Sequence, residues 1–182
     1  QVLTLFPYTT LFRSLAMPLT VQRNVLYWFA PARDARLFAP ERFPVFLGEV
    51  TEGTMWYGFT DTGDGVKVAL HHHGPATTPA EVNRVVHPSE AMHLRSLLDR
   101  FMPAASGALR ETGVCTYTNA PDEQFIIDRH PAADRVIVAS PCSGHGFKFA
   151  SAIGEVLVDL VQGGASRFDL TPFGLGRAAL RI

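Results

Sequence analysis

The stretch RVIVASPCSGHGFKFASAIGEVLVDLVQGG, residues 135–164, contains an apolar run, a glycine loop and an amphipathic segment in that order. The run at 135–140 is apolar at successive positions, which is typical of a strand buried on both faces. The segment from about 145 to 162 has apolar residues at helical spacing, and Gly163-Gly164 ends it. The apolar positions are Phe149, Ile153, Val156, Leu157 and Leu160. The stretch therefore predicts a strand–loop–helix unit near the end of the chain.

The loop of this unit carries Gly144, His145 and Gly146, which fit the first half of a G-x-G-x-x-G fingerprint. Phe149 stands where a third glycine would allow close packing of helix on strand, so the fingerprint fails. The loop could still bind a ligand through its backbone, because glycines let a backbone approach a ligand closely and a helix N-terminus offers free N–H groups. Lys148 adds a positive charge at the start of the helix. An ordinary tight turn with a solvated lysine is the alternative.

Short apolar runs separated by turn residues make up much of the remaining chain. Strands are expected at 21–29, 43–50, 54–60, 66–73, 113–118 and 124–130. The close spacing of the early strands favours an antiparallel meander over parallel crossovers. Residues 32–42 are expected to form a polar loop.

Two helices are predicted between these groups of strands. Thr78-Pro79-Ala80-Glu81 is a capping box with proline at the first helical position, and it predicts a short helix through about Val86. Pro88-Ser89 begins a second helix, which Pro103 stops. Its apolar positions are Leu94, Leu97, Leu98 and Phe101. This order of elements predicts the α+β class: an antiparallel sheet with helices, followed by a small α/β element at the tail.

The composition argues against several classes of function. The chain has 182 residues, of which 47% are hydrophobic and 18% charged, as in an ordinary globular domain with a sizeable core. A net charge of −1 argues against nucleic acid or a membrane surface as a partner. No apolar run reaches the roughly 18 residues that a membrane span needs. Two cysteines, Cys115 and Cys142, are too few for a disulfide framework, so a reducing, cytoplasmic setting is expected.

Residues 1–14 are unlike the remainder of the chain. The sequence TLFPYTTLFRS at 4–14 has no acidic residue, no clear period and no cap, and it looks like the conceptual translation of a DNA-sequencing adapter. An apolar N-terminal strand is the alternative. We expect residues 1–14 to be an artefact and the chain to be a fragment that lacks its true N-terminus.

The polar residues, taken one by one, leave their roles open. In the triplet His71–His73 only the first and last share a strand face, and no partner stands at zinc-ligand spacing, so no metal site is expected. Buried free cysteines are usually inert. The charged residues of 121–131 are either acid–base groups or turn and strand-end ion pairs. They are Asp122, Glu123, Asp128, Arg129 and His130.

Several blocks together resemble one family. GVCTYTNAPDEQFIIDRHP (113–131), SGHGFKFASAIGEVLVDL (143–160) and FDLTPFGLGR (168–177) are similar to the C-terminal half of the monomeric sarcosine oxidase, N-methyltryptophan oxidase and pipecolate oxidase family. MWYGF (55–59) followed by VKVALHH (66–72) is similar to the substrate-domain strands of the same family. The resemblance covers about residues 18–177.

The resemblance implies an FAD-binding domain that is discontinuous in sequence. Its phosphate-binding unit opens the protein, the substrate domain is inserted, and a final strand and helix return to complete it. Residues 15–120 would then be part of the substrate domain, and residues 121–182 the return. The returning helix would not bind the pyrophosphate, and its N-terminus would face the flavin ring. This explains why a strand–loop–helix unit lies last.

The resemblance also implies four catalytic residues. Lys67 matches a lysine over the flavin that promotes the reaction with oxygen, because a fixed cation stabilises superoxide as it forms. His71, four residues further on the same strand face, matches an active-site histidine near the bound amine. Tyr57 and Tyr117 match tyrosines of the substrate pocket.

The cofactor contacts follow from the same resemblance. Cys115 matches the cysteine that carries the flavin through a thioether at the 8-methyl carbon, and Cys142 falls at a variable position. Lys148 matches the lysine that pairs with the substrate carboxylate. The flavin-facing loop would consist of Ser143, Gly144, His145, Gly146, Phe147 and Lys148.

The resemblance therefore implies an FAD-dependent oxidase that converts the C–N unit of an N-substituted amino acid to an imine and reduces oxygen to hydrogen peroxide. Sarcosine, N-methyltryptophan and pipecolate all remain candidate substrates, and the complete protein is expected to be a monomer. Two alternatives stay open at this point. One is a related dehydrogenase with another electron acceptor, and the other is a non-enzymatic domain that binds small molecules.

Overall fold

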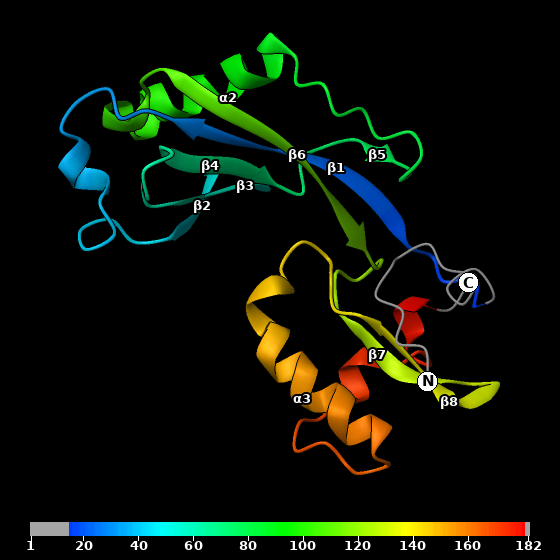
Figure 1. Cartoon of the computed structure of the whole chain (residues 1–182). Helices are drawn as coiled ribbons and strands as arrows, with labels where there is room; N and C mark the ends of the chain where they lie inside the picture. Colours follow the sequence, from blue (N-terminus) through cyan, green and yellow to red (C-terminus); the bar gives the residue numbers. More distant parts are fainter. Residues whose placement is uncertain (1–14, 181–182) are drawn as a thin grey trace. The chain divides into compact units, whose positions relative to one another are not determined.

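A computed structural model describes residues 15–180, so the expected artefact at 1–14 lies outside the described residues. The chain folds into two compact units (Figure 1). One is Gln22–Thr116, and the other joins residues 15–21 to residues 117–180. An antiparallel sheet with a few helices dominates, which confirms the α+β class.

The larger sheet belongs mainly to the unit Gln22–Thr116. Its strands are β1 (Thr20–Phe29), β2 (Phe46–Thr51), β3 (Thr54–Phe59), β4 (Val66–His71), β5 (Ala76–Thr77) and β6 (Leu109–Asn119). They lie in the order β2-β3-β4-β1-β5, and β6 also pairs with β1. The pairs β2–β3, β3–β4 and β1–β4 are antiparallel, which confirms the predicted meander.

Helix α2 (Pro88–Phe101) covers one face of this sheet (Figure 1). Side chains alternate along a strand, so every second residue of β1, β3 and β4 points toward α2. The buried side chains from these strands are Tyr27, Phe29, Trp56, Val66 and Val68. They pack against Leu94 and Leu98, two of the positions predicted from helical spacing, and form the core of this unit.

The helix predicted at 78–86 is wrong. Thr78 and Glu81 do pair, with the hydroxyl donating to the carboxylate over 2.9 Å, but they close only a turn. The side chain of Asn83 then accepts the backbone N–H of Val85, a local hydrogen bond that competes with helical ones, and Val85 is 63% exposed. The capping box that operates lies at the start of α2, where the carboxylate of Glu90 accepts the backbone N–H of His87.

Two other boundaries differ from the sequence prediction. The strand expected at 66–73 ends at His71, because His72 adopts a left-handed backbone with φ of 51° and turns the chain. The loop at 32–42 contains a 3-10 turn, η1 (Ala35–Phe38), whose last residue is buried. That buried phenylalanine joins the core of the unit.

The second unit is built on a hairpin of β7 (Ile126–His130) and β8 (Ala133–Ser140), with helix α3 (Ala150–Val161) packed beside it (Figure 1). The strands are antiparallel. Phe125 and Ile127 pack against Val156 and its neighbours on one side of the hairpin. A second small core contains Ile126 and Val138.

Helix α3 begins at Ala150, five residues later than predicted. A 3-10 turn, η3 (Phe147–Phe149), precedes it, so Lys148 lies in this turn and not in the first turn of the helix. The predicted buried face is correct at Val156, with Ile153 and Leu160 partly buried beside it, but Phe149 is 40% exposed.

Candidate active site

The face of the sheet opposite α2 carries most of the predicted catalytic residues, and we call it the open face. Strand register shows how they are arranged. Lys67 of β4 lies between Trp28 of β1 and Phe59 of β3 in one row across the sheet. The next row contains Ala69 and Tyr57. His71 follows on β4, so the predicted residues of β3 and β4 share one face.

The ammonium group of Lys67 lies over two aromatic rings. Its Nζ is 5.2 Å from the centroid of the Trp28 ring and 5.1 Å from that of the Phe59 ring. Both distances are within the range of a cation–π interaction. Neither aromatic residue was predicted as part of the site, and the only signal for them in the sequence was the alternation within their own strands.

Tyr57 and His71 are neighbours on the open face. Their ring centroids are 6.0 Å apart with an interplanar angle of 87°, an edge-to-face arrangement. The rings of Tyr57 and Phe59 are arranged in the same way, with centroids 6.1 Å apart. The open face thus presents a tyrosine and an imidazole near the row of Lys67.

Cys115 of β6 lies on the same face. A Cβ at Gly113 would be 3.5 Å from the ring of Trp28, so alternation places Cys115, two residues on, on the side of that ring. The thiol is free and half-buried. Burial raises its pKa, while the positive charge of Lys67 acts in the opposite direction. Tyr117, further along β6, is buried and belongs to the other unit.

The histidines after β4 make ring contacts with other histidines, His72 with His71 and His73 with His93. His73 does not share a strand face with His71, because the strand has already ended; its ring stacks on that of His93, with centroids 5.9 Å apart. No group of three or more metal-ligating side chains occurs within residues 15–180. No helix in this range is long and apolar enough to cross a membrane.

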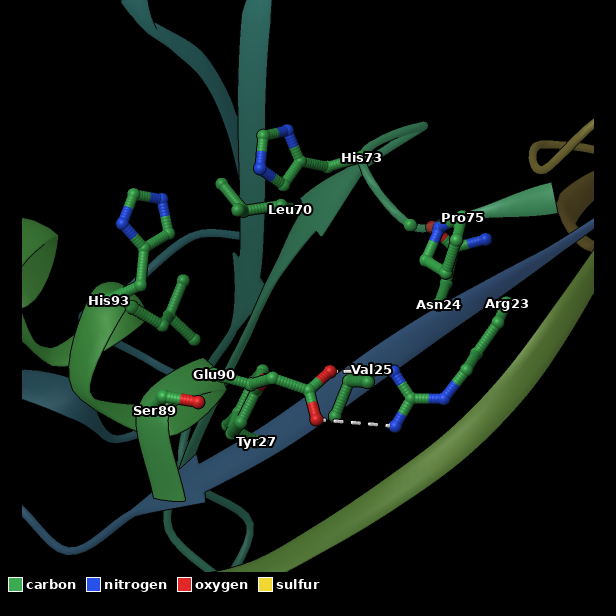
Figure 2. A pocket seen from close by; sticks show the side chains of 12 residues that line it. Arg23, Asn24, Val25, Tyr27, Leu70, His73, Pro75, Ser89, Glu90 and His93 are labelled. Carbon is green, nitrogen blue, oxygen red and sulfur yellow. Dashed lines mark hydrogen bonds and ion pairs between the residues drawn. The ribbon is translucent and has the colours of Figure 1, made fainter. Parts of the chain in front are cut away.

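A cavity of about 290 Å³ lies between α2, β1 and the loop after β4 (Figure 2). Arg23 and Glu90 point toward each other within it, and their ion pair measures 2.6 Å. The guanidinium also donates to the backbone carbonyls of Asn83 and Val85, so its donors are used within the protein. Burial, and then the charge of Glu90, raises the pKa of Tyr27 in the cavity wall to about 12.

In the second unit, the predicted flavin-facing loop is held to the segment 118–124. Ser143 is 1% exposed, and its backbone N–H donates to the carbonyl of Thr118 over 2.9 Å. Its hydroxyl accepts the N–H of Ala120 and donates to the carbonyl of Gln124. Gly146 is required for packing, because a Cβ there would lie 1.6 Å from the carbonyl oxygen of Pro141.

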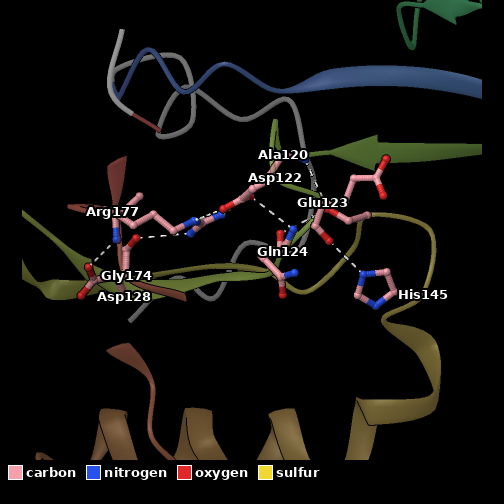
Figure 3. A network of polar contacts seen from close by, with 10 residues as sticks. Ala120, Asp122, Glu123, Gln124, Asp128, His145, Gly174 and Arg177 are labelled. Atoms are coloured by element: carbon pink, nitrogen blue, oxygen red, sulfur yellow. Dashed lines mark hydrogen bonds and ion pairs between the residues drawn. The ribbon is translucent and has the colours of Figure 1, made fainter. Parts of the chain in front are cut away.

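His145 and Lys148 of this loop differ in their surroundings. His145 Nε2 lies 2.9 Å from the carbonyl of Glu123 (Figure 3), and its ring lies 5.0 Å from that of Phe125. Lys148 is exposed, with its ammonium 5.1 Å from the ring of Phe149. Both also border an apolar cavity of about 400 Å³ formed by α3, β7 and residues 168–173.

The charged residues of 121–131 make structural contacts, which favours the second of the two hypotheses for them. Asp122 pairs in two places with Arg177, at 2.8 and 3.0 Å (Figure 3). The carboxylate of Asp128 accepts the N–H of Leu175 over 2.8 Å. Arg129 donates to the carbonyl of Leu160 near the end of α3. These contacts tie the C-terminal segment and α3 to β7.

Comparison with known proteins gives a consistent picture. Residues 3–160 match the sequence profile of the family described as FAD dependent oxidoreductase. A monomeric sarcosine oxidase of Streptomyces avermitilis is 39% identical over 173 residues, which cover 93% of this chain and 45% of that protein. An N-methyl-L-tryptophan oxidase of Salmonella dublin is 38% identical over 163 residues, covering 88% and 43%. The chain therefore spans less than half the length of these curated relatives.

The fold has solved counterparts as well. The deglycating enzyme fructosamine oxidase from Aspergillus fumigatus superposes with a TM-score of 0.71 at 20% sequence identity. The match covers 91% of this chain and 42% of that one. At this identity the likeness concerns the fold.

Proposed function

The chain belongs to the family of FAD-dependent oxidoreductases, and we propose that it is part of an oxidase of secondary or N-methyl amino acids. In this proposal residues 15–120 contribute to the substrate domain and residues 121–182 return to the FAD-binding domain. Bound FAD would accept a hydride equivalent from the C–N unit of the amine and pass the electron pair to oxygen, so that amine and oxygen become imine and hydrogen peroxide.

One observation carries the proposal: a cation, a thiol and aromatic groups share the open face. Trp28 and Phe59 place their rings against the ammonium of Lys67. Lys67 would stabilise negative charge that builds on oxygen during its reduction. Tyr57 and His71 would line the amine pocket, with Tyr117 as a third pocket residue, and Cys115 supplies the thiol for covalent attachment.

The loop 143–148 has a supporting role in this proposal. Ser143 and Gly146 hold the loop in one conformation through buried contacts, and rigid loops orient ligands better than mobile ones. Gly144, His145 and Phe147 complete the flavin-facing loop. Lys148 is exposed, and its ammonium would pair with the substrate carboxylate.

Oxygen is proposed as the electron acceptor because of Lys67. A dehydrogenase that delivers electrons to another partner has no need of a cation fixed beside the flavin, whereas an oxidase gains rate from it. We also propose a monomer in a reducing, cytoplasmic setting, since both cysteines are free thiols.

The test uses the complete enzyme that contains this chain, incubated separately with sarcosine, N-methyltryptophan and pipecolate. Hydrogen peroxide should accumulate with at least one of them, in step with oxygen consumption. Reduction of an artificial dye without formation of peroxide would support the dehydrogenase hypothesis. Absence of any reaction with the three amines would overturn the proposal.

The covalent attachment has a matched control within the chain. Protein precipitated with acid should stay yellow, and Cys115→Ser should release the colour. Cys142→Ser should keep it, because the resemblance assigns the attachment to Cys115 and places Cys142 at a variable position. The opposite result for the two variants would refute the assignment.

A further inference from the structure

The position of the Lys67 ammonium is set by two neighbouring strands. Trp28 and Phe59 are the direct register partners of Lys67 on either side, so their rings flank the lysine side chain across the sheet. Cβ atoms of directly opposed residues lie about 4.5–5.5 Å apart, which brings long side chains into contact. The two ring contacts, at 5.2 and 5.1 Å, agree with this geometry.

No carboxylate competes for this ammonium within residues 15–180. Carboxylates of the described residues pair with Arg23, Arg167 and Arg177, and none of these pairs involves Lys67. Lysine has a flexible four-carbon stem, and an ammonium without a fixed partner samples many positions. The faces of Trp28 and Phe59 are therefore the contacts that hold Nζ in one place.

The backbone next to Trp28 supports this arrangement. Gly113 of β6 lies under the indole, and a Cβ there would already be in van der Waals contact with the ring at 3.5 Å. A larger side chain at this position would push the indole away from Lys67. A glycine in a strand interior is otherwise unfavourable, and close approach by another group is one reason for its presence.

We propose that Trp28 and Phe59 are positioning residues for the oxygen reaction, which they serve by holding the Lys67 ammonium where negative charge develops. This inference rests on the proposed function and adds two residues to it. The rings act through the lysine. An aromatic replacement should therefore preserve their effect, while an aliphatic replacement of similar bulk should not.

The first measurement compares Trp28→Leu with Trp28→Phe in the complete enzyme, using stopped-flow spectroscopy. With Trp28→Leu the rate of reoxidation by oxygen should fall by about threefold to tenfold, the size expected for loss of one cation–π contact. Anaerobic reduction by substrate should keep its rate. Trp28→Phe should restore most of the oxygen rate. Phe59→Leu, at a ring that is 39% exposed, should behave like Trp28→Leu.

The second measurement is a double-mutant cycle with Lys67→Met. Lys67→Met alone should slow reoxidation by about 10²–10³-fold, as for removal of one preorganised electrostatic group. Adding Trp28→Leu to Lys67→Met should then have no further effect, because the ring acts only through the lysine.

The outcomes separate the two claims. Normal reoxidation in Lys67→Met would overturn the role of the lysine in the proposed function. A slow Lys67→Met enzyme with normal reoxidation in both Trp28→Leu and Phe59→Leu would leave the proposed function intact and overturn the positioning inference. Additive losses in the double mutant would also overturn it, because the ring would then act independently of the lysine.

Discussion

The two faces of one sheet differ in what their side chains do. On β4, Val66 and Val68 are fully buried under α2, while Lys67, between them, points to the open face and keeps part of its surface exposed. The same hydrogen-bonded backbone therefore supports an apolar core on one side and charged and aromatic groups on the other. Since the core holds the strands rigid, the groups on the open face keep the spacing on which their ring contacts depend.

The largest effect is expected from a matched pair of phenylalanines. Phe29 is 0% exposed on the covered face, and Phe59 is 39% exposed on the open face. Phe29→Ala should lower the free energy of unfolding by about 3–5 kcal/mol, because it removes a buried ring and leaves a cavity. Phe59→Ala should lower it by less than about 1 kcal/mol. Chemical denaturation of the complete enzyme measures both changes.

Equal losses for the two variants would show that the open face is packed as tightly as the covered one. The contrast between the faces would then be wrong, and Phe59 would have to be regarded as a core residue.

The second prediction concerns a substitution that changes the rate of reoxidation but not the free energy of unfolding. Lys67→Met should slow reoxidation by about 10²–10³-fold, equivalent to about 2.7–4 kcal/mol, and leave the unfolding free energy within about 0.5 kcal/mol. Val68→Ala, its neighbour on the covered face, should destabilise the protein by about 1–3 kcal/mol and leave the rate of reoxidation unchanged. A large loss of stability in Lys67→Met would contradict the separation of roles.

Local sequence pattern predicted the meander, the positions Leu94 and Leu98 of α2 and strand β7, because alternation and helical spacing express burial directly. The strand expected at 135–140 is present as β8, but it lies in an antiparallel hairpin and buries only Val138 and Ser140, so the expected burial on both faces is wrong. Local pattern also failed at 78–86, where the side chain of Asn83 bonds the local backbone and the chain only turns, and at the start of α3, where a 3-10 turn replaces the first helical turn. Such ends depend on local hydrogen bonds that pattern does not reveal.

Part of the candidate site was also beyond prediction. The contact of Lys67 with Trp28 joins residues from two strands, and only the strand register brings them together. The role of Gly146 depends in the same way on where Pro141 lies, since the close carbonyl leaves no room for a side chain. The G-x-G pattern suggested close approach of a ligand, whereas the structure shows close approach of the backbone.

The smallest effect is expected where a charge lies on the covered side. Burial of the Glu90 carboxylate opposes its ionisation, but the hydrogen bonds from Arg23 and from the backbone of His87, together with the positive charge of Arg23, outweigh burial and hold the pKa of Glu90 below its ordinary value. Glu90→Gln should cost about 1–3 kcal/mol at neutral pH, since it leaves the buried guanidinium of Arg23 without a counter-ion.

The direction of the pKa shift of Glu90 predicts how the stability difference between the wild type and Glu90→Gln changes with pH. A carboxyl group whose folded pKa is depressed contributes full stability above its unfolded value of about 4.3, and this contribution is lost as the pH falls through the folded pKa. The difference in unfolding free energy between the wild type and Glu90→Gln should therefore be constant near neutrality and shrink in acid.

Glu81→Gln, at an exposed carboxylate in the turn, should change stability by less than about 0.5 kcal/mol. A pH-independent difference for Glu90→Gln would mean that its amide disturbs packing and that the ion pair does not stabilise the covered face. Slower reoxidation in this variant with unchanged stability would show that α2 affects the open face, so that the two faces could no longer be treated as independent.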